Sequence, residues 1–335
     1  MKEKIILFWS GFDFETDKTL ETWRARGVKL SPFHALTLAS HCKFNGGAKL
    51  YTYQKFISPK VPKGIEVKDA HEILPAELAF SALSRGHNIA HVSDAVRLTV
   101  ASRMDGIVMD MDATVLRELP REDGFFTSIP AKLSGGVAPK WGQAHPPIKV
   151  HDNSWDGRAL SNFPAKAKRS NREAFFALAS KVVRTLSDAP KKGTQAWNFV
   201  MWELKNMAKR DVESKVFPPL AFGPIPAWLR QGKCYSMESP TRLTGDITLF
   251  GYPLPSVNEI MEKSYAVQHY FESAFKGAEN RLSPFFWWQV PEKCLVSREA
   301  LHIFGDDWRQ KLLRLSMLEA KESTEVFRAV TGENR

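Results

Sequence analysis

The segment from residue 93 to residue 112, SDAVRLTVASRMDGIVMDMD, constrains the fold of this 335-residue chain more than any other part of it. Ser93 is a suitable N-cap for a helix, and Gly106 is a suitable residue to end that helix. The apolar run 107–109 then has the length and composition of a short buried strand. The segment therefore predicts a helix followed directly by a strand of a sheet interior.

Two acidic residues, Asp110 and Asp112, come directly after this predicted strand. A strand rises about 3.3 Å per residue and alternates its faces, so both carboxylates should leave on one side, roughly 6–7 Å apart at Cα. This spacing suits one hydrated divalent cation with its phosphates, because Mg²⁺ keeps several positions for water and substrate oxygens. The pattern Asp-x-Asp has little specificity by itself in a chain with 37 acidic residues.

Strands and helices alternate along the first third of the chain. Strands are predicted over 5–9, 49–53 and, more weakly, 65–67, with a helix over 36–44. This alternation predicts an α/β fold with a mostly parallel central sheet and flanking helices. Ligands of such sheets bind beyond the carboxyl ends of the strands, where Trp9 and the aspartate pair would both lie.

After the first third, the chain has a segment without helical or strand periodicity, followed by further predicted helices. Residues 121–160 are rich in Gly, Pro and polar side chains and predict a long irregular excursion over the mouth of the site. Helical periodicity returns over 171–186 and 194–209, and residues 306–330 predict one or two charged amphipathic helices.

Composition places the chain among ordinary soluble proteins, with 43% hydrophobic and 25% charged residues. Its three cysteines, Cys42, Cys234 and Cys294, have neither a metal-ligand spacing nor a disulfide framework, which favours a reducing compartment. The N-terminal apolar run of about five residues is too short for a secretory signal. No stretch approaches the roughly 20 apolar residues of a membrane span. We therefore expect a cytoplasmic protein without a transmembrane segment.

The net charge of +10 bears on partners and not on fold. It favours an anionic acceptor or surface, such as nucleic acid, a phosphorylated polysaccharide or, through peripheral contact, an anionic membrane leaflet. A basic surface without a specific partner fits the same charge equally well. The cluster of Lys166, Lys168, Arg169 and Arg172 carries no recognised nucleic-acid motif.

SDAVRL followed by DGIVMDMDATVLRELP resembles the core of the DXD-motif glycosyltransferases of GT-A type. These include the glucosyltransferase domains of large clostridial toxins, yeast initiating mannosyltransferases and bacterial capsule sugar transferases. Their usual pattern is a Ser-Asp-x-x-Arg helix, a Gly-Gly-Ile strand and an Asp-x-Asp turn, and here Asp105 replaces the first glycine. The resemblance implies a GT-A-like, Rossmann-type fold with a largely helical C-terminal part.

The resemblance also implies roles for single residues. In the family, an aromatic residue after the first strand stacks on the nucleotide base, and Trp9 matches it. By the same resemblance Asp94 and Arg97 would bind the donor, while Asp110 and Asp112 would hold Mn²⁺ or Mg²⁺.

More distant landmarks match less well. Asn162 would reach the donor sugar, and His269 and Ser273 would lie near the metal and the diphosphate. Ala274 stands where the family has a Trp after that serine, and Phe222 stands in place of the Thr of a Thr-Gly-Pro turn.

The function implied is that of a metal-dependent retaining glycosyltransferase. It would move a hexose from a nucleotide-diphosphate sugar, with UDP-sugars such as UDP-glucose favoured, to a saccharide or other acceptor. Residues 1–120 would form the nucleotide-sugar-binding core, 121–160 the irregular region, 161–280 the rest of the catalytic domain and 281–335 a C-terminal helical extension.

Other interpretations stay open at this point. A DNA glycosyltransferase acting on a modified base fits the basic charge. A non-enzymatic polyanion-binding protein of the same fold and an aspartate-dependent phosphohydrolase are further alternatives. Asp94 and Arg97, three residues apart, also fit a surface ion pair worth a few tenths of a kcal/mol. Trp9 and His269 also fit plain core packing.

Overall fold

The computed structural model describes residues 4–55, 57–58, 61–130, 158–160, 165–188, 190, 198–210, 215–224, 248–249, 252–253, 255–269, 292 and 294–316. Two predicted donor-binding residues, Asn162 and Ser273, lie outside these ranges. So do residues 131–157 of the predicted irregular excursion and residues 317–330 of the predicted C-terminal helices.

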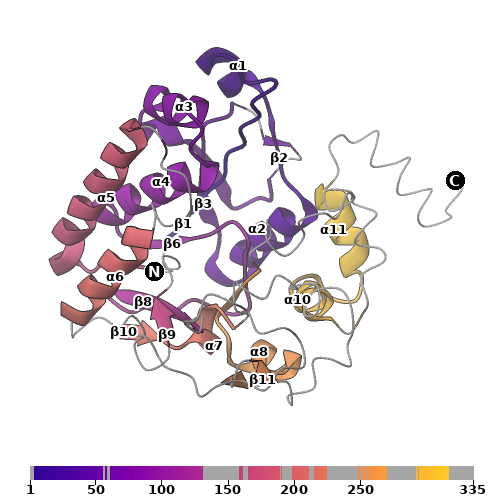
Figure 1. Ribbon diagram of the computed structural model, residues 1–335. Coiled ribbons are helices and arrows are strands. Elements are labelled where there is room, and N and C mark those ends of the chain that lie inside the picture. The colour runs from indigo at the N-terminus through magenta and orange to yellow at the C-terminus, as the bar shows by residue number, and fades with distance from the viewer. Residues whose placement is uncertain are drawn as a thin grey trace, which may run out of the picture.

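A four-stranded sheet lies at the centre of the fold, in the order β5-β3-β1-β6 (Figure 1). Its strands are β1 (Ile5–Phe8), β3 (Ala48–Thr52), β5 (Ile65–Asp69) and β6 (Ile107–Met109). All three neighbouring pairs are parallel, which confirms the α/β class and the mostly parallel central sheet.

Strand order reverses at one place in the sheet. From β1 the chain builds β3 and β5 on one side and then places β6 on the other side of β1. The reversal between β1 and β6 is a topological switch point, the place where open α/β sheets bind ligands. Trp9 follows β1 and Asp110 follows β6, so these residues flank the switch point.

Gly106 permits the close approach of β6 to β1. Its φ is +156°, and a Cβ at this position would lie 2.7 Å from the carbonyl oxygen of Lys4. The prediction that Gly106 ends the preceding helix is wrong, because that helix ends at Arg103 and Met104 is its C-cap. The glycine is needed by the strand pairing, since its neighbour Ile107 bonds to the same Lys4 carbonyl.

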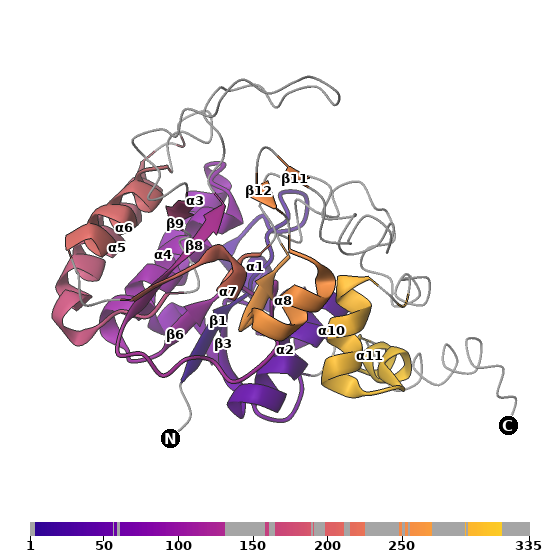
Figure 2. The same cartoon turned by 90° about the horizontal axis from the view of Figure 1, so that it is seen from below.

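The alternation of β1 side chains divides the core between two layers of helices. Ile6 and Phe8 pack on the side of α4 (Ile89–Arg103) and α5 (Arg172–Ser187). Ile5 and Leu7 pack on the other side, in a cluster with Leu38 of α2 (Pro32–Asn45). Figures 1 and 2 show α4, α5 and α6 on one flank of the molecule and α2, α10 and α11 on the other.

Helix α4 begins five residues earlier than the sequence indicates. Its N-cap is Asn88, whose side-chain oxygen accepts a hydrogen bond from the backbone N–H of Ala90 at 3.0 Å. The assignment of Ser93 as the N-cap is therefore wrong. Asp94 and Arg97 lie in the middle of a 15-residue helix and not in its first turn.

The other elements surround this core. The helices are α1 (Leu20–Ala25), α3 (Ala76–Ser84), α6 (Asn198–Arg210), α7 (Pro219–Phe222), α8 (Val257–Lys263), α10 (Leu295–Phe304) and α11 (Trp308–Ser316). The strands are β2 (Val28–Lys29), β4 (Ile57–Ser58), β7 (Ala113–Val115), β8 (Phe125–Pro130), β9 (Arg158–Leu160), β10 (Lys215–Phe217), β11 (Thr248–Leu249), β12 (Tyr252–Pro253) and β13 (Ala266–Gln268). Among the described residues no helix combines the length and the apolar character needed to cross a bilayer.

The described residues of the region 121–160 include two strands. Strand β8 lies within it and pairs with β10 in parallel and with β9 antiparallel. The predicted helices over 171–186 and 194–209 are confirmed as α5 and α6, with α6 beginning at Asn198 among the described residues. Helices α8, α10 and α11 confirm a largely helical C-terminal part.

Helix α2 is almost entirely buried, including its two histidines. Burial lowers the pKa of His34 and of His41 from 6.5 to about 3, so both rings are neutral near pH 7. The unfolded chain protonates these rings below about pH 6.5. Stability is therefore retained above that pH and is lost as the pH falls toward 3.

We expect His41→Leu to reduce this acid sensitivity. Each buried histidine should cost about 1.4 kcal/mol per pH unit below 6.5. The drop in unfolding free energy between pH 7.5 and pH 5.5, measured by urea titration, should therefore be about 1.4 kcal/mol smaller in the variant. Equal pH dependence in both proteins would show that His41 does not resist protonation.

Candidate functional site

A buried guanidinium joins the two predicted motifs. Arg97 donates from Nη2 to Asp94 Oδ1 at 2.9 Å and from Nε to the Ser93 carbonyl at 3.3 Å. Its Nη1 forms an ion pair with Asp110 Oδ1, directly after β6. Asp94 and Arg97 are 5% and 6% exposed, so the interpretation as a surface ion pair is wrong.

Burial of the Arg97 guanidinium costs desolvation free energy, which its carboxylate partners offset. Burial lowers the pKa of Arg97, and the carboxylates of Asp94 and Asp112 oppose that shift. A buried charge is tolerated only with close partners, because its desolvation costs several kcal/mol. The guanidinium and its carboxylates therefore hold one another in place at the switch point.

The Asp-x-Asp segment forms a turn between β6 and β7. Gln268 of β13 donates from Nε2 to Asp110 Oδ2, so both oxygens of this carboxylate have protein partners. The amide of His269 donates to the Asp112 carbonyl at 2.9 Å, one residue beyond the pairing of Gln268 with Ala113. The antiparallel pair β7–β13 thus fixes the turn from its far side.

The side chain of His269 lies on the C-terminal helical side of the turn. Its Nε2 is 2.9 Å from Glu299 Oε2 of α10, and both side chains are fully buried. Its ring centroid is 5.1 Å from that of Phe33. Nδ1 is buried and has no hydrogen-bond partner within the described part of the chain. A metal role would therefore have to use Nδ1.

Trp9 directly follows β1 at the switch point. It is partly buried against the cluster around Leu7, and its amide donates to the Tyr51 carbonyl at 3.0 Å. Its ring centroid is 4.0 Å from that of His34, with 47° between the planes. Burial lowers the pKa of His34 to about 3, so the imidazole beside Trp9 is neutral near pH 7. One side of the indole is packed, and the remainder is at the edge of the sheet.

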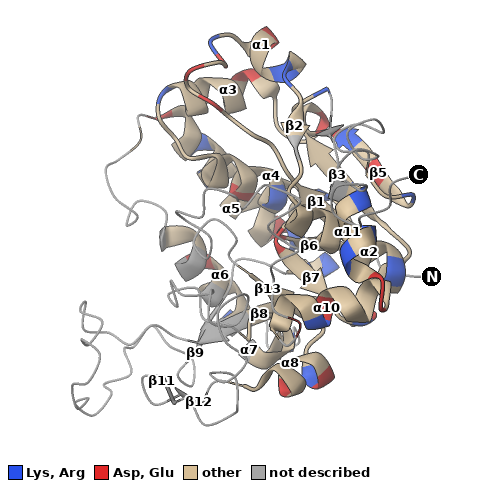
Figure 3. Ribbon diagram, turned by 90° about the vertical axis from the view of Figure 1, so that its right-hand side faces the viewer, with Lys and Arg blue, Asp and Glu red and all other residues tan. Residues whose placement is uncertain are grey.

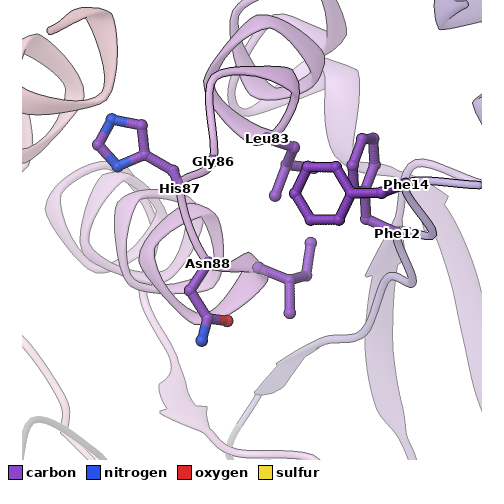
Figure 4. Close-up of a pocket in the computed structure, with 7 residues that line it drawn as sticks. Phe12, Phe14, Leu83, Gly86, His87 and Asn88 are labelled. Carbon is purple, nitrogen blue, oxygen red and sulfur yellow. The ribbon is translucent and has the colours of Figure 1, made fainter. Parts of the chain in front are cut away.

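A pocket of about 340 Å³ opens at the N-terminal end of α4. Figure 4 shows Phe12, Phe14 and Leu83 on one side of it and Asn88 on the other. The lining residues are Phe12, Phe14, Leu83, Gly86, His87, Asn88 and Ile89. Asn88 precedes Arg97 by nine residues, about 13 Å along a helix axis. Phe14, 57% exposed, offers an aromatic face to this pocket.

The residues of the turn fit a divalent cation with few protein ligands. Asp110 is engaged by Arg97 and Gln268, and Asp112 is the second carboxylate of the turn. Within the described ranges no group of three or more His, Cys, Asp or Glu side chains could hold a metal ion. One or two carboxylates are enough for Mg²⁺, because its other positions are filled by water and substrate phosphates.

Two residues of the site were missed in the sequence. Gln268 precedes the predicted residue His269 and lies on the opposite side of the same strand, where it reaches Asp110. Glu299 occupies the apolar face of α10 together with Leu295, Ala300 and Ile303. A charged residue at a core position of an amphipathic helix was the available signal, because such a residue needs a buried partner.

Lys and Arg of the described residues are spread over several elements, including α2 and α11, with Asp and Glu between them (Figure 3). Within the cluster at 166–172, Lys166 is buried and donates from Nζ to the Glu122 carbonyl at 2.7 Å. Arg172 pairs with Asp105. These two residues therefore have structural partners.

Replacement of Arg97 by Met should destabilise the fold by about 3–5 kcal/mol, because it leaves the buried Asp94 and the half-buried Asp110 without their cation. The exposed pair Glu118–Arg121 has the same spacing of three residues and serves as a matched control. Arg121→Met should change the unfolding free energy by less than about 0.5 kcal/mol. Chemical denaturation of both variants tests this, and equal losses would contradict it.

Comparison with known proteins gives a limited result. No protein-family model matches the chain, and no curated protein matches it. Among solved structures, the PaToxG glycosyltransferase aligns over 95% of this chain and 88% of its own, with 12% identity and a TM-score of 0.31. A transferase with two cysteine-to-serine substitutions aligns over 61% of this chain and 85% of its own, with 12% identity and a TM-score of 0.30. A likeness of this size carries no weight for function, which has to come from the site.

Proposed function

We propose that this protein is a metal-dependent glycosyltransferase that uses a nucleotide-diphosphate sugar. The observation that carries the proposal is the joining of Asp94, Arg97 and the Asp-x-Asp turn in one buried network at the switch point. The sequence resemblance connects the same residues. In the structure Arg97 contacts Asp110, although the two residues are not adjacent in sequence.

The charge of the network supports a cation. Asp94, Asp110 and Asp112 with Arg97 carry a formal charge of −2. A donor diphosphate is also anionic, so it would be repelled from this edge without a compensating positive charge. Asp112 would hold Mn²⁺ or Mg²⁺, which neutralises charge that develops on a departing diphosphate.

Each residue has a role in this proposal. Arg97 positions Asp94 and Asp110 and contributes positive charge near the leaving diphosphate. Asp94 accepts hydrogen bonds from hydroxyl groups of the sugar and so orients it, and Trp9 stacks on the base. The bond between the anomeric carbon and the diphosphate oxygen breaks as the acceptor oxygen bonds to that carbon, and the proton of the acceptor hydroxyl passes to the departing diphosphate oxygen. Retention of the anomeric configuration follows the resemblance.

The acceptor we favour is a saccharide. The pocket beside α4 supports this choice, because an exposed phenyl ring and an asparagine suit the apolar face and the hydroxyls of a sugar ring. A modified DNA base is the second candidate, favoured by the net charge of +10.

Asp112→Asn should abolish metal-dependent hydrolysis of the donor. We expect release of nucleotide from a UDP- or GDP-sugar in Mn²⁺ or Mg²⁺ and none in EDTA. The variant should be slower by about 10³-fold, because it loses the charge that holds the cation. Asp105→Asn is the matched control, since Asp105 is 77% exposed. No turnover and no thermal shift with any donor would reject the proposal.

Salt dependence should separate the two acceptor classes. Binding to duplex DNA that depends on phosphate contacts must weaken steeply between 50 and 200 mM salt, by about 10³-fold or more for six contacts. We expect oligosaccharide binding that changes little over this range, measured by calorimetry beside a DNA duplex. Tight, salt-sensitive binding of the duplex alone would favour the DNA base instead.

A further inference from the structure

Glu299 is a buried glutamate whose partner belongs to the site. It is 0% exposed on α10 and follows His269 by 30 residues in sequence. The 2.9 Å contact between its Oε2 and His269 Nε2 joins the C-terminal helices to the strand that carries Gln268. A buried carboxyl group is costly unless it is hydrogen-bonded, so this contact decides how both side chains are held.

The two nitrogens of His269 have different surroundings. Nε2 faces Glu299, whereas Nδ1 is buried without a hydrogen-bond partner in the described ranges. A buried N–H without an acceptor is rarer than a buried lone pair without a donor. The arrangement therefore favours the tautomer with the proton on Nε2, which donates to Glu299, and a lone pair on Nδ1.

The strand register places this ring beside the Asp-x-Asp turn. Gln268 is paired with Ala113, and the next residues, His269 and Asp112, are joined by the 2.9 Å backbone hydrogen bond. Opposite residues of an antiparallel pair project to the same face with Cβ atoms about 4.5–5.5 Å apart. The imidazole and the Asp112 carboxylate therefore start from one face of the β7–β13 pair.

We infer that Glu299 is a positioning residue, which accepts a hydrogen bond from His269 Nε2 and so keeps the Nδ1 lone pair available beside Asp112 for the divalent cation. Histidines that bind metals commonly donate their other ring N–H to a carboxylate, which fixes ring and tautomer. The inference rests on the proposed function for the presence of a cation. It adds a residue of α10 that the Asp-x-Asp motif does not contain.

The experiment is a titration of Mn²⁺ followed by electron paramagnetic resonance, with no nucleotide sugar present. Glu299→Ala should weaken Mn²⁺ binding by about 10–100-fold. Glu299→Gln keeps an oxygen that can accept from Nε2 and should recover most of the affinity. Glu292→Ala is the matched control on the same part of the chain, because the Glu292 side chain is 81% exposed, and it should bind Mn²⁺ as the wild type does.

A second measurement needs neither a variant nor turnover. Nitrogen-15 NMR of the metal-free wild type should show His269 protonated at Nε2. Protonation at Nδ1 instead, or wild-type Mn²⁺ affinity in a folded Glu299→Ala protein, would overturn the inference. If Glu299→Ala does not fold, the tautomer of His269 in the wild-type protein decides the question.

These outcomes separate the inference from the proposed function. Mn²⁺ binding that depends on Glu299, without hydrolysis of any nucleotide sugar, would keep the inference and reject the transferase. Hydrolysis of a nucleotide sugar, together with Mn²⁺ binding that is unchanged in Glu299→Ala, would keep the proposed transferase function and reject the inference. A wild-type protein that binds no Mn²⁺ would overturn both.

Discussion

The ion pair between Arg97 and Asp110 is the interaction on which the site depends. It connects the middle of α4 to the end of β6, and Asp94 completes it from one helical turn away. A guanidinium suits this place because it can bond two carboxylates in fixed directions while it stays charged. Its burial makes the arrangement costly to change, since a lone charge at this depth would lose its hydration without compensation.

The carboxyl edge of the sheet gathers residues that are far apart in sequence. Trp9 comes from β1, Asp94 and Arg97 from α4, the aspartates from the β6–β7 turn and Gln268 from β13. Strand order brings the first three groups together, because β1 and β6 are neighbours at the switch point. The antiparallel pair β7–β13 then adds a segment that follows the turn by more than a hundred residues.

The C-terminal helices are part of this arrangement. Glu299 bonds His269, and His302 Nε2 lies 2.8 Å from the carbonyl oxygen of Leu116 at the end of β7. Helix α10 thus contacts both strands that hold the Asp-x-Asp turn, while its apolar side packs on α2 through Val296 and Ala300. The helical part therefore supports the geometry of the turn as well as the core beneath it.

Local patterns were sufficient for the parallel sheet, the strand before Asp110 and the helix that carries Asp94 and Arg97, because periodicity and turn residues act within about 20 residues. They misplaced the start of α4, since Asn88 competes with Ser93 as an N-cap and tertiary packing of residues 89–92 decides between them. Burial of the Asp94–Arg97 pair, the Gln268 bond to Asp110 and the Glu299–His269 contact were decided only by the tertiary structure. The two contacts of Gln268 and Glu299 join residues whose distance in sequence carries no signal, and the burial of the Asp94–Arg97 pair depends on how α4 packs on the sheet.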